Sequence, residues 1–206
     1  LHIGRWVLKE ATRQMAEWVE RLGPAAPPTI SINLSRKQFV QTDLAEQVHA
    51  AAVNSGLPPS RIQLEITEDT FAMDVPKAIA TMNAIKKLGF LLAIDDFGTG
   101  CSSFASLHEF PADVLKIDRS LLNDIETSKQ TAALVHALAI LANNLGLAIV
   151  AEGVERESEV SILRELGCHF GQGFYFARPL SPDAFAEFAL RRIAEESNVI
   201  PAASLE

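Results

Sequence analysis

The chain has 206 residues, of which 48% are hydrophobic and 21% are charged, and this suits one globular domain with a sizeable core. The formal net charge of −8 excludes an overall positive field for nucleic-acid polymers or acidic membranes, so a phosphate-bearing ligand would need local cations. The longest apolar stretches are too short to span a bilayer. Cys101 and Cys168 fit no metal or redox spacing, which favours a reduced, cytoplasmic compartment.

The two ends of the chain do not resemble natural domain ends. Leu1 falls directly on a helical pattern, so we expect the protein to extend upstream and to carry a strand before residue 1. Leu205-Glu206 is typical of a tag remnant. We therefore expect one N-terminally incomplete domain over residues 1–204, with residues 205–206 outside it.

Hydrophobic periodicity and turn residues predict that helices and strands alternate along the chain. In chain order, we predict helix 4–22, strand 29–34, helix 43–55, strand 61–68, helix 75–88, strand 90–95, short helix 102–110, strand 114–118, helix 127–145, strand 147–153, helix 157–166, strand 169–176 and a last helix that begins at Ser181-Pro182-Asp183. Such alternation produces parallel βαβ units. Two architectures fit, an open doubly wound sheet and part of an eight-stranded barrel.

The positions of polar residues favour the barrel. Every predicted strand carries them at or near its C-terminal end; they are Asn33, Glu65, Glu68, Asp95, Asp96, Lys116, Asp118, Glu152, Glu155 and Gln172. A TIM barrel draws its chemistry from the C-terminal ends of several strands, whereas an open sheet concentrates its ligands at one switch point. The sequence therefore predicts an α/β fold, a modified (β/α)8 TIM barrel whose first strands lie upstream of this chain.

Carboxylates gathered at that face predict a metal centre. The charged residues concerned are Glu65, Asp95, Asp96, Lys116 and Glu152. Four carboxylates against one ammonium cannot stay ionised and dry without cations. Hard oxygen ligands, to which Asn33 adds an amide oxygen, suit Mg²⁺, Mn²⁺ or Ca²⁺ and argue against zinc or copper. Two adjacent aspartates that each serve a metal are typical of two-metal hydrolysis of phosphate esters.

Simpler roles stay open for several of these residues. Glu68 and Glu155 also fit acids at a helix start, where the macrodipole favours them. Asp118 equally fits an N-cap or an ion-pair partner. Lys116 has no such simple reading, because a buried unpaired lysine is rare. Cys168 fits a small core residue.

Six motifs resemble those of the EAL domain family in order and spacing, over essentially the whole chain. They are Asn33-Leu34-Ser35, Leu64-Glu65-Ile66-Thr67-Glu68, Asp95-Asp96-Phe97-Gly98-Thr99-Gly100, Leu115-Lys116-Ile117-Asp118-Arg119-Ser120, Ala151-Glu152-Gly153-Val154-Glu155 and Gln172-Gly173-Phe174. The resemblance implies a modified TIM barrel and a role in bacterial second-messenger signalling. Active members of the family linearise cyclic di-GMP to 5′-pGpG with Mg²⁺ or Mn²⁺, and Ca²⁺ is expected to inhibit.

The resemblance also implies which residues would hold two metal ions. Asn33, Glu65 and Asp95 would be metal ligands. Asp95 would bridge the two ions and Asp96 would hold the second. Glu152 would act as the general base or as a ligand of the second metal.

Three further residues receive supporting roles from the resemblance. Lys116 would orient the attacking water or the phosphate, and Gln172 would support that arrangement. Glu68 would hold the loop that starts at Asp96. Cyclic di-GMP would be the ligand, in a homodimer or in a protein that carries a sensory or GGDEF domain upstream.

The chain departs from the family pattern in two places. The Glu-Ala-Leu motif, with a metal-ligating glutamate and a phosphate-binding arginine, would precede Leu1, so we expect this polypeptide by itself to be weak or inactive. Cys101 stands where the family usually has Tyr, in a loop linked to dimer contacts. Two other readings stay open, a silent receptor that only binds cyclic di-GMP and a structural or dimerisation remnant.

Overall fold

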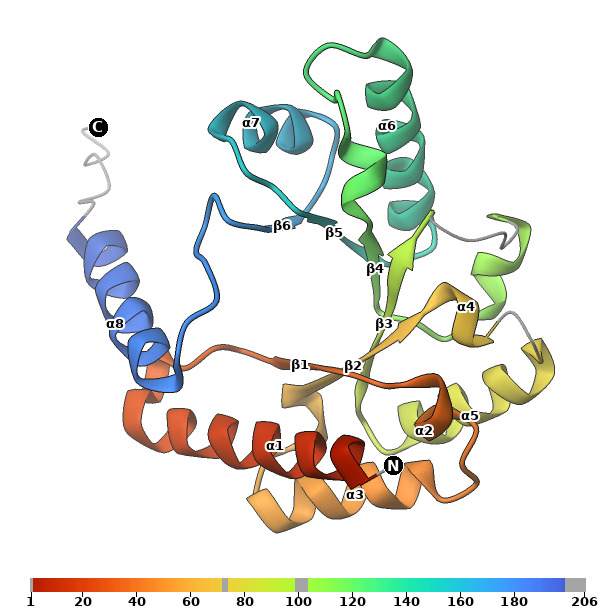
Figure 1. Cartoon of the computed structure of the whole chain (residues 1–206), viewed down its shortest axis with the longest axis vertical. Helices are drawn as coiled ribbons and strands as arrows, with labels where there is room; N and C mark the ends of the chain where they lie inside the picture. Colours follow the sequence, from red (N-terminus) through yellow and green to blue (C-terminus); the bar gives the residue numbers. More distant parts are fainter. Residues whose placement is uncertain (1, 72–73, 99–103, 199–206) are drawn as a thin grey trace, which may run out of the picture.

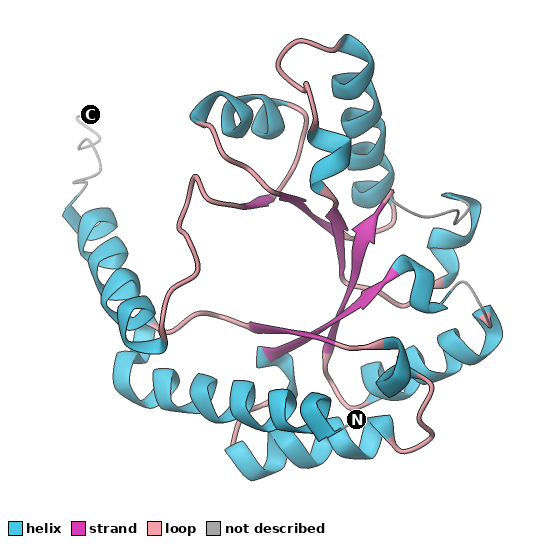
Figure 2. Ribbon diagram, viewed as in Figure 1, coloured by secondary structure: helices cyan, strands magenta, loops and turns pink. Residues whose placement is uncertain are grey.

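The computed structural model describes residues 2–71, 74–98 and 104–198. Within them, six parallel strands form one sheet in the order β1-β2-β3-β4-β5-β6. The strands are β1 (Ile30–Asn33), β2 (Ile62–Thr67), β3 (Leu91–Phe97), β4 (Val114–Ile117), β5 (Ala148–Glu152) and β6 (Phe170–Gln172). Figure 2 shows the strands as part of a ring, with the helices on its outside.

The strand order decides between the two predicted architectures. A parallel sheet whose spatial order equals its chain order winds in one direction only, as the wall of a barrel does, whereas a doubly wound sheet reverses at a switch point. The fold is therefore a half-barrel of the TIM type, as predicted. Among the described residues, β1 and β6 each pair with one neighbour and form the two edges of the sheet.

Helices connect the strands and cover the outer face of the sheet (Figure 1). The α-helices are α1 (His2–Leu22), α2 (Arg36–Phe39), α3 (Leu44–Ser55), α4 (Glu68–Phe71), α5 (Val75–Lys87), α6 (Lys129–Asn144), α7 (Glu157–Glu165) and α8 (Pro182–Asn198). The short 3₁₀ helices are η1 (Gly23–Ala25), η2 (Pro59–Arg61), η3 (Phe104–Glu109) and η4 (Arg119–Leu122). None of the described helices is both long enough and apolar enough to cross a membrane.

Local sequence explains where several helices begin and end. The Asp74 side chain accepts a hydrogen bond from Lys77 N at 3.2 Å and caps α5, and Ser128 accepts one from Thr131 N at 3.1 Å and caps α6. Each bond satisfies an amide that has no partner inside the helix. Helix α3 ends at Gly56, whose φ of 72° is the left-handed conformation that glycine adopts without strain.

Three predicted elements differ from the structure, and two short helices were not predicted. Helices α2 and α4 were not predicted. The strand expected through Glu68 ends at Thr67, because α4 begins at Glu68. The strand expected over 169–176 covers only Phe170–Gln172. The predicted helix 102–110 is the 3₁₀ helix η3, and residues 102–103 lie outside the described residues.

The core lies between the sheet and the helices. Large side chains of the central strands are fully buried there, together with residues of α5; they are Leu64, Ile66, Leu92, Ile94, Leu115, Met82 and Ile85. These strands read as near-continuous apolar runs because a parallel sheet of this class is covered on both faces. The polar residues are consequently confined to the strand ends.

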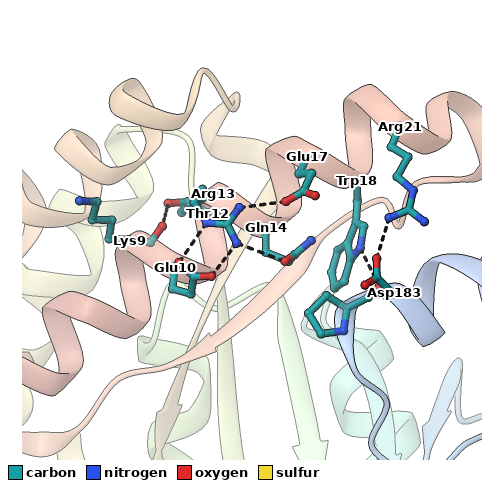
Figure 3. A network of polar contacts seen from close by, with 10 residues as sticks. Lys9, Glu10, Thr12, Arg13, Gln14, Glu17, Trp18, Arg21 and Asp183 are labelled. Carbon is teal, nitrogen blue, oxygen red and sulfur yellow. Dashed lines mark hydrogen bonds and ion pairs between the residues drawn. The ribbon is translucent and has the colours of Figure 1, made fainter.

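Helix α8 returns to the first helix of the chain (Figure 3). Arg21 Nη1 lies 2.8 Å from Asp183 Oδ1, and Trp18 Nε1 donates a hydrogen bond to the Pro182 carbonyl at 3.2 Å. The rings of Trp18 and Phe185 lie 4.5 Å apart between centroids. These contacts fix the C-terminal helix against α1, outside the sheet.

Candidate metal centre

Four adjacent strands bring their charged residues together around one lysine. Lys116 Nζ, on β4, lies 3.0 Å from Glu65 Oε2 on β2, 2.9 Å from Asp95 Oδ1 on β3 and 2.7 Å from Glu152 Oε1 on β5. Relative exposure is 4% for Lys116, 5% for Glu65 and 7% for Asp95. Because a lone buried charge is costly, this burial is tolerated only through the pairing.

A β-bulge explains how two consecutive aspartates serve one site. Successive side chains of a regular strand point to opposite faces. Between β3 and β4 the register runs from Ile94 opposite Leu115 to Phe97 opposite Ile117, so β3 holds one extra residue there. Asp96 has a φ of 53°, and a bulge of this kind re-aims a side chain.

The bulge brings both aspartates to the carboxylate of β5. One oxygen each of Asp95, Asp96 and Glu152 can be chosen so that all three lie within 4.8 Å of one another. Such a group of carboxylate oxygens suits a hard divalent cation such as Mg²⁺ or Mn²⁺. The donor chemistry of the site therefore fits the metal ions that the sequence predicts.

Burial and charge shift the protonation equilibria of the cluster. Burial raises the pKa of Asp96, and the nearby charges of Asp95 and Asp118 raise it further. Burial also raises the pKa of Glu152, although the hydrogen bond from Lys116 acts in the opposite direction. For Lys116, burial lowers the pKa, but its hydrogen bonds to Glu152 and Asp95 outweigh that effect and hold the pKa above its ordinary value. The lysine thus stays protonated beside an excess of carboxylates.

Two predicted site residues, the ligand Asn33 and the supporting residue Gln172, flank the cluster through strand register. Asn33 is opposite Glu65 in the β1–β2 pair, and Gln172 is opposite Glu152 in the β5–β6 pair. Both side chains are exposed. The structure therefore brings Glu65, Asp95, Asp96, Lys116 and Glu152 into one group, with the two amides beside its outer members.

Glu68 contacts the loop that follows Asp96 of the cluster. Its Oε2 accepts a hydrogen bond from the backbone N–H of Gly98 at 3.1 Å, and its side chain is buried at the start of α4. The loop after Asp96 is thus tied to the end of β2. The role that the family resemblance implies for Glu68, holding the loop that starts at Asp96, stays a prediction.

The remaining acids at the strand ends have structural partners. Asp118 caps η4 and accepts a hydrogen bond from Ser120 N at 2.8 Å, which holds the pKa of Asp118 below its ordinary value. Glu155 Oε1 lies 2.7 Å from Arg119 Nη1. The sequence did not single out Arg119 or Leu121, although both contact glycines that follow the cluster. Cys101 lies outside the described residues.

Comparison with protein families and curated proteins gives a consistent result. The family model of the EAL domain matches residues 1–179. The bifunctional diguanylate cyclase/cyclic di-GMP phosphodiesterase MucR of Pseudomonas aeruginosa is 41% identical over 180 residues, which cover 87% of this chain and 26% of MucR. The cyclic di-GMP phosphodiesterase NbdA of the same species is 36% identical over 183 residues, covering 89% of this chain and 23% of NbdA. The chain thus spans about a quarter of the length of these relatives.

Solved structures show the same fold. The PaMucR phosphodiesterase in complex with c-di-GMP has a TM-score of 0.83 and 40% identity, and the match covers 89% of this chain and 74% of that chain. BlrP1 of Klebsiella pneumoniae has been solved with c-di-GMP and calcium or manganese. Its manganese complex matches with a TM-score of 0.75 and 30% identity, over 85% of this chain and 45% of that chain.

Proposed function

This chain belongs to the EAL domain family, and from that premise we propose that it hydrolyses cyclic di-GMP to linear pGpG in a metal-dependent reaction. One observation carries the proposal. Lys116 lies within 3.0 Å of three carboxylates from three other strands, while one oxygen of Asp96 lies within 4.8 Å of oxygens of Asp95 and Glu152. A purely structural role does not require four buried or half-buried carboxylates around one lysine.

In this proposal the strand-end oxygens hold two divalent ions. Asn33, Glu65, Asp95 and Asp96 would hold the ions, and Glu152 would serve either as a ligand of the second ion or as the general base. When bound, Mg²⁺ or Mn²⁺ lowers the pKa of a coordinated water and neutralises the phosphate charge. Ca²⁺ would be held by the same oxygens and is expected to inhibit.

The chain's own residues then accept the proton of the water and orient the phosphate. As the general base, Glu152 would accept a proton from the attacking water. Lys116 stays protonated and orients the water or the phosphate, and Gln172 supports this arrangement beside Glu152. Glu68 holds the loop after Asp96 through Gly98 N.

The cellular setting follows from the same reading. We place the domain in the cytoplasm, where two cysteines without disulfide or metal spacing remain reduced. MucR is a bifunctional cyclase and phosphodiesterase by name, which supports an upstream sensory or GGDEF domain for the whole protein. A homodimer completes the proposal, and the net charge of −8 argues against nucleic-acid polymers as partners.

Turnover of cyclic di-GMP tests the proposal. The natural full-length protein is incubated with cyclic di-GMP and Mn²⁺, and the products are separated by chromatography. We expect linear pGpG, no product in EDTA, and little product when Ca²⁺ replaces Mn²⁺. Tight binding without any pGpG would instead identify a receptor. The absence of both binding and turnover would refute the proposed function.

A further inference from the structure

The 3₁₀ helix η4 lies against two glycines that each follow the carboxylate cluster. Gly98 comes two residues after Asp96 and has a φ of 99°, and Gly153 comes directly after Glu152 and has a φ of 72°. Both contacts come from η4, which follows Lys116 and β4 in the chain. One short helix therefore touches the loop of β3 and the loop of β5.

Arg119 covers Gly153 with the aliphatic part of its side chain. A Cβ atom added at Gly153 would lie 2.7 Å from Cβ and Cγ of Arg119 and 2.8 Å from Cδ. Because the backbone of η4 fixes the Cβ of Arg119, no rotamer of that side chain removes the clash. The ion pair from Arg119 Nη1 to Glu155 at 2.7 Å holds the same loop further along.

Leu121 covers Gly98 in the same manner from the other end of η4. A Cβ atom added at Gly98 would lie 2.2 Å from Cδ1 and 3.0 Å from Cγ of Leu121. On its other side, the N–H of Gly98 is held by Glu68 Oε2. The loop after Asp95 and Asp96 is thus fixed between a buried carboxylate and a leucine of η4.

Helix η4 is itself firmly placed. Its first turn is capped by Asp118, which accepts from Ser120 N at 2.8 Å and, through its carbonyl, from Leu121 N at 3.0 Å. Leu122 and Ile125 anchor this segment in the core with 7% and 3% exposure. Close packing of this kind transmits displacements instead of absorbing them.

We infer that Arg119 and Leu121 are positioning residues that set the separation of the β3 and β5 loops, so that Asp95, Asp96 and Glu152 can share one divalent ion. The inference rests on the proposed metal centre. It assigns the two glycines a specific purpose, because only a residue without Cβ lets η4 approach both loops this closely. Partners that orient metal ligands in this way affect metal affinity by about 10- to 100-fold.

Glycine-to-alanine variants of the natural full-length protein separate positioning from backbone strain. Gly146 has a φ of 73°, nearly that of Gly153, yet a Cβ added there meets none of the described atoms within 4 Å. Gly146→Ala should lower the melting temperature of the metal-free protein and leave Mn²⁺ affinity unchanged. Gly153→Ala should also weaken Mn²⁺ binding by about tenfold or more, measured by calorimetry.

Two exposed-site variants test the same contact without risk to folding. Arg119→Met keeps the stem that covers Gly153 and should bind Mn²⁺ as the wild type does, because an exposed ion pair contributes little. Arg119→Ala removes the stem and should bind Mn²⁺ more weakly. Equal affinities for these two variants and the wild type would overturn the inference.

Paired substitutions provide the specific signature. Arg119→Gly, which removes the Cβ that meets residue 153, should restore Mn²⁺ binding to Gly153→Ala. Leu121→Ala should restore it to Gly98→Ala, whereas the crossed pairs should stay defective. Unchanged Mn²⁺ affinity in Gly153→Ala, or equal rescue of both glycine variants by Arg119→Gly and by Leu121→Ala, would overturn the inference alone. A wild-type protein that binds neither Mn²⁺ nor Mg²⁺ would overturn the proposed function and the inference with it.

Discussion

Lys116 Nζ lies 2.7 Å from Glu152 Oε1 across the pair of parallel strands β4 and β5. Both residues of this contact have a pKa above the ordinary value. Glu152 also belongs to the group in which one carboxylate oxygen each of Asp95, Asp96 and Glu152 lie within 4.8 Å of one another. The charge excess of the cluster, four carboxylates against one ammonium, makes specific predictions about metal, charge and pH.

Divalent metal should stabilise the folded protein. An ion that binds only the folded state at about 100 times its dissociation constant adds about 2.7 kcal/mol to the free energy of unfolding. We expect Mg²⁺ and Mn²⁺ at millimolar concentrations to raise the melting temperature, with NaCl of equal ionic strength as the control. An unchanged melting temperature with both ions would contradict the metal centre.

Removing one charge at constant volume should abolish turnover without unfolding the protein. Asp95→Asn and Glu152→Gln each retain shape and lose a negative charge, so product formation should stop while the circular dichroism spectrum is preserved. Glu165→Gln, on the exposed surface of α7, is the matched control and should keep full activity. Near-normal rates in the first two variants would exclude their proposed roles.

Lys116→Met should lose turnover and become dependent on metal for stability. Methionine fills the space of the lysine stem, but three carboxylates lose their ammonium, and breaking a buried pair costs about 3–5 kcal/mol. We expect a lower melting temperature in EDTA that Mg²⁺ largely recovers, with turnover still absent. Normal turnover would show that Lys116 only neutralises the neighbouring carboxylates.

A lysine away from the cluster provides the control for that variant. Lys86 Nζ lies 2.5 Å and 2.7 Å from the two carboxylate oxygens of Asp113, which precedes β4 and so lies at the opposite end of the strands. Lys86→Met should lower stability in a manner that Mg²⁺ does not correct, and turnover per folded molecule should be retained.

The metal-free protein should lose stability as the pH rises through the titration of Glu152. Burial raises the pKa of Glu152 and of Asp96, so between the ordinary carboxyl value of about 4 and the raised values the folded state binds more protons than the unfolded state. The free energy of unfolding then falls with increasing pH.

Comparing the wild type with Glu152→Gln separates the contribution of Glu152 to the pH dependence of stability from that of the other carboxylates. In EDTA, the stability of the wild type relative to Glu152→Gln should decrease as the pH rises above about 4, measured by urea denaturation. In Mg²⁺ the decrease should vanish, because the ion binds the deprotonated carboxylates. A relative stability that increases with pH in EDTA would contradict the assignment.

Much of the barrel could be predicted because its signals are local. Short apolar runs that end in polar residues identified β1 to β5, and the polar ends at Asn33, Glu65, Asp95, Lys116 and Glu152 indicated one chemical face. The last strand was predicted too long, because the contacts that end it come from a distant part of the chain. Residues 174–176 are aromatic and resemble a strand, but Gly173 packs against the backbone of Val154, and Tyr175 N bonds to the Val154 carbonyl at 3.0 Å.

The bulge and the η4 contacts could not be predicted from sequence pattern. The extra residue of β3 exists only relative to β4, so the pattern placed both aspartates at the site but did not predict the bulge that brings Asp96 to Asp95 and Glu152. The contacts of Arg119 and Leu121 join residues far apart in the chain. Only the glycines at 98 and 153 were visible in advance, and their partners depend on the tertiary fold.

Anomalous diffraction at the manganese absorption edge locates bound metal ions directly. Crystals of the natural protein are soaked with Mn²⁺ and cyclic di-GMP, and anomalous peaks are located. A two-metal centre predicts two peaks, with Asp95 between them, Asp96 and Glu152 beside the second, and a phosphate of the ligand in contact with both. A single peak distant from these carboxylates, or none in crystals that contain the ligand, would contradict it.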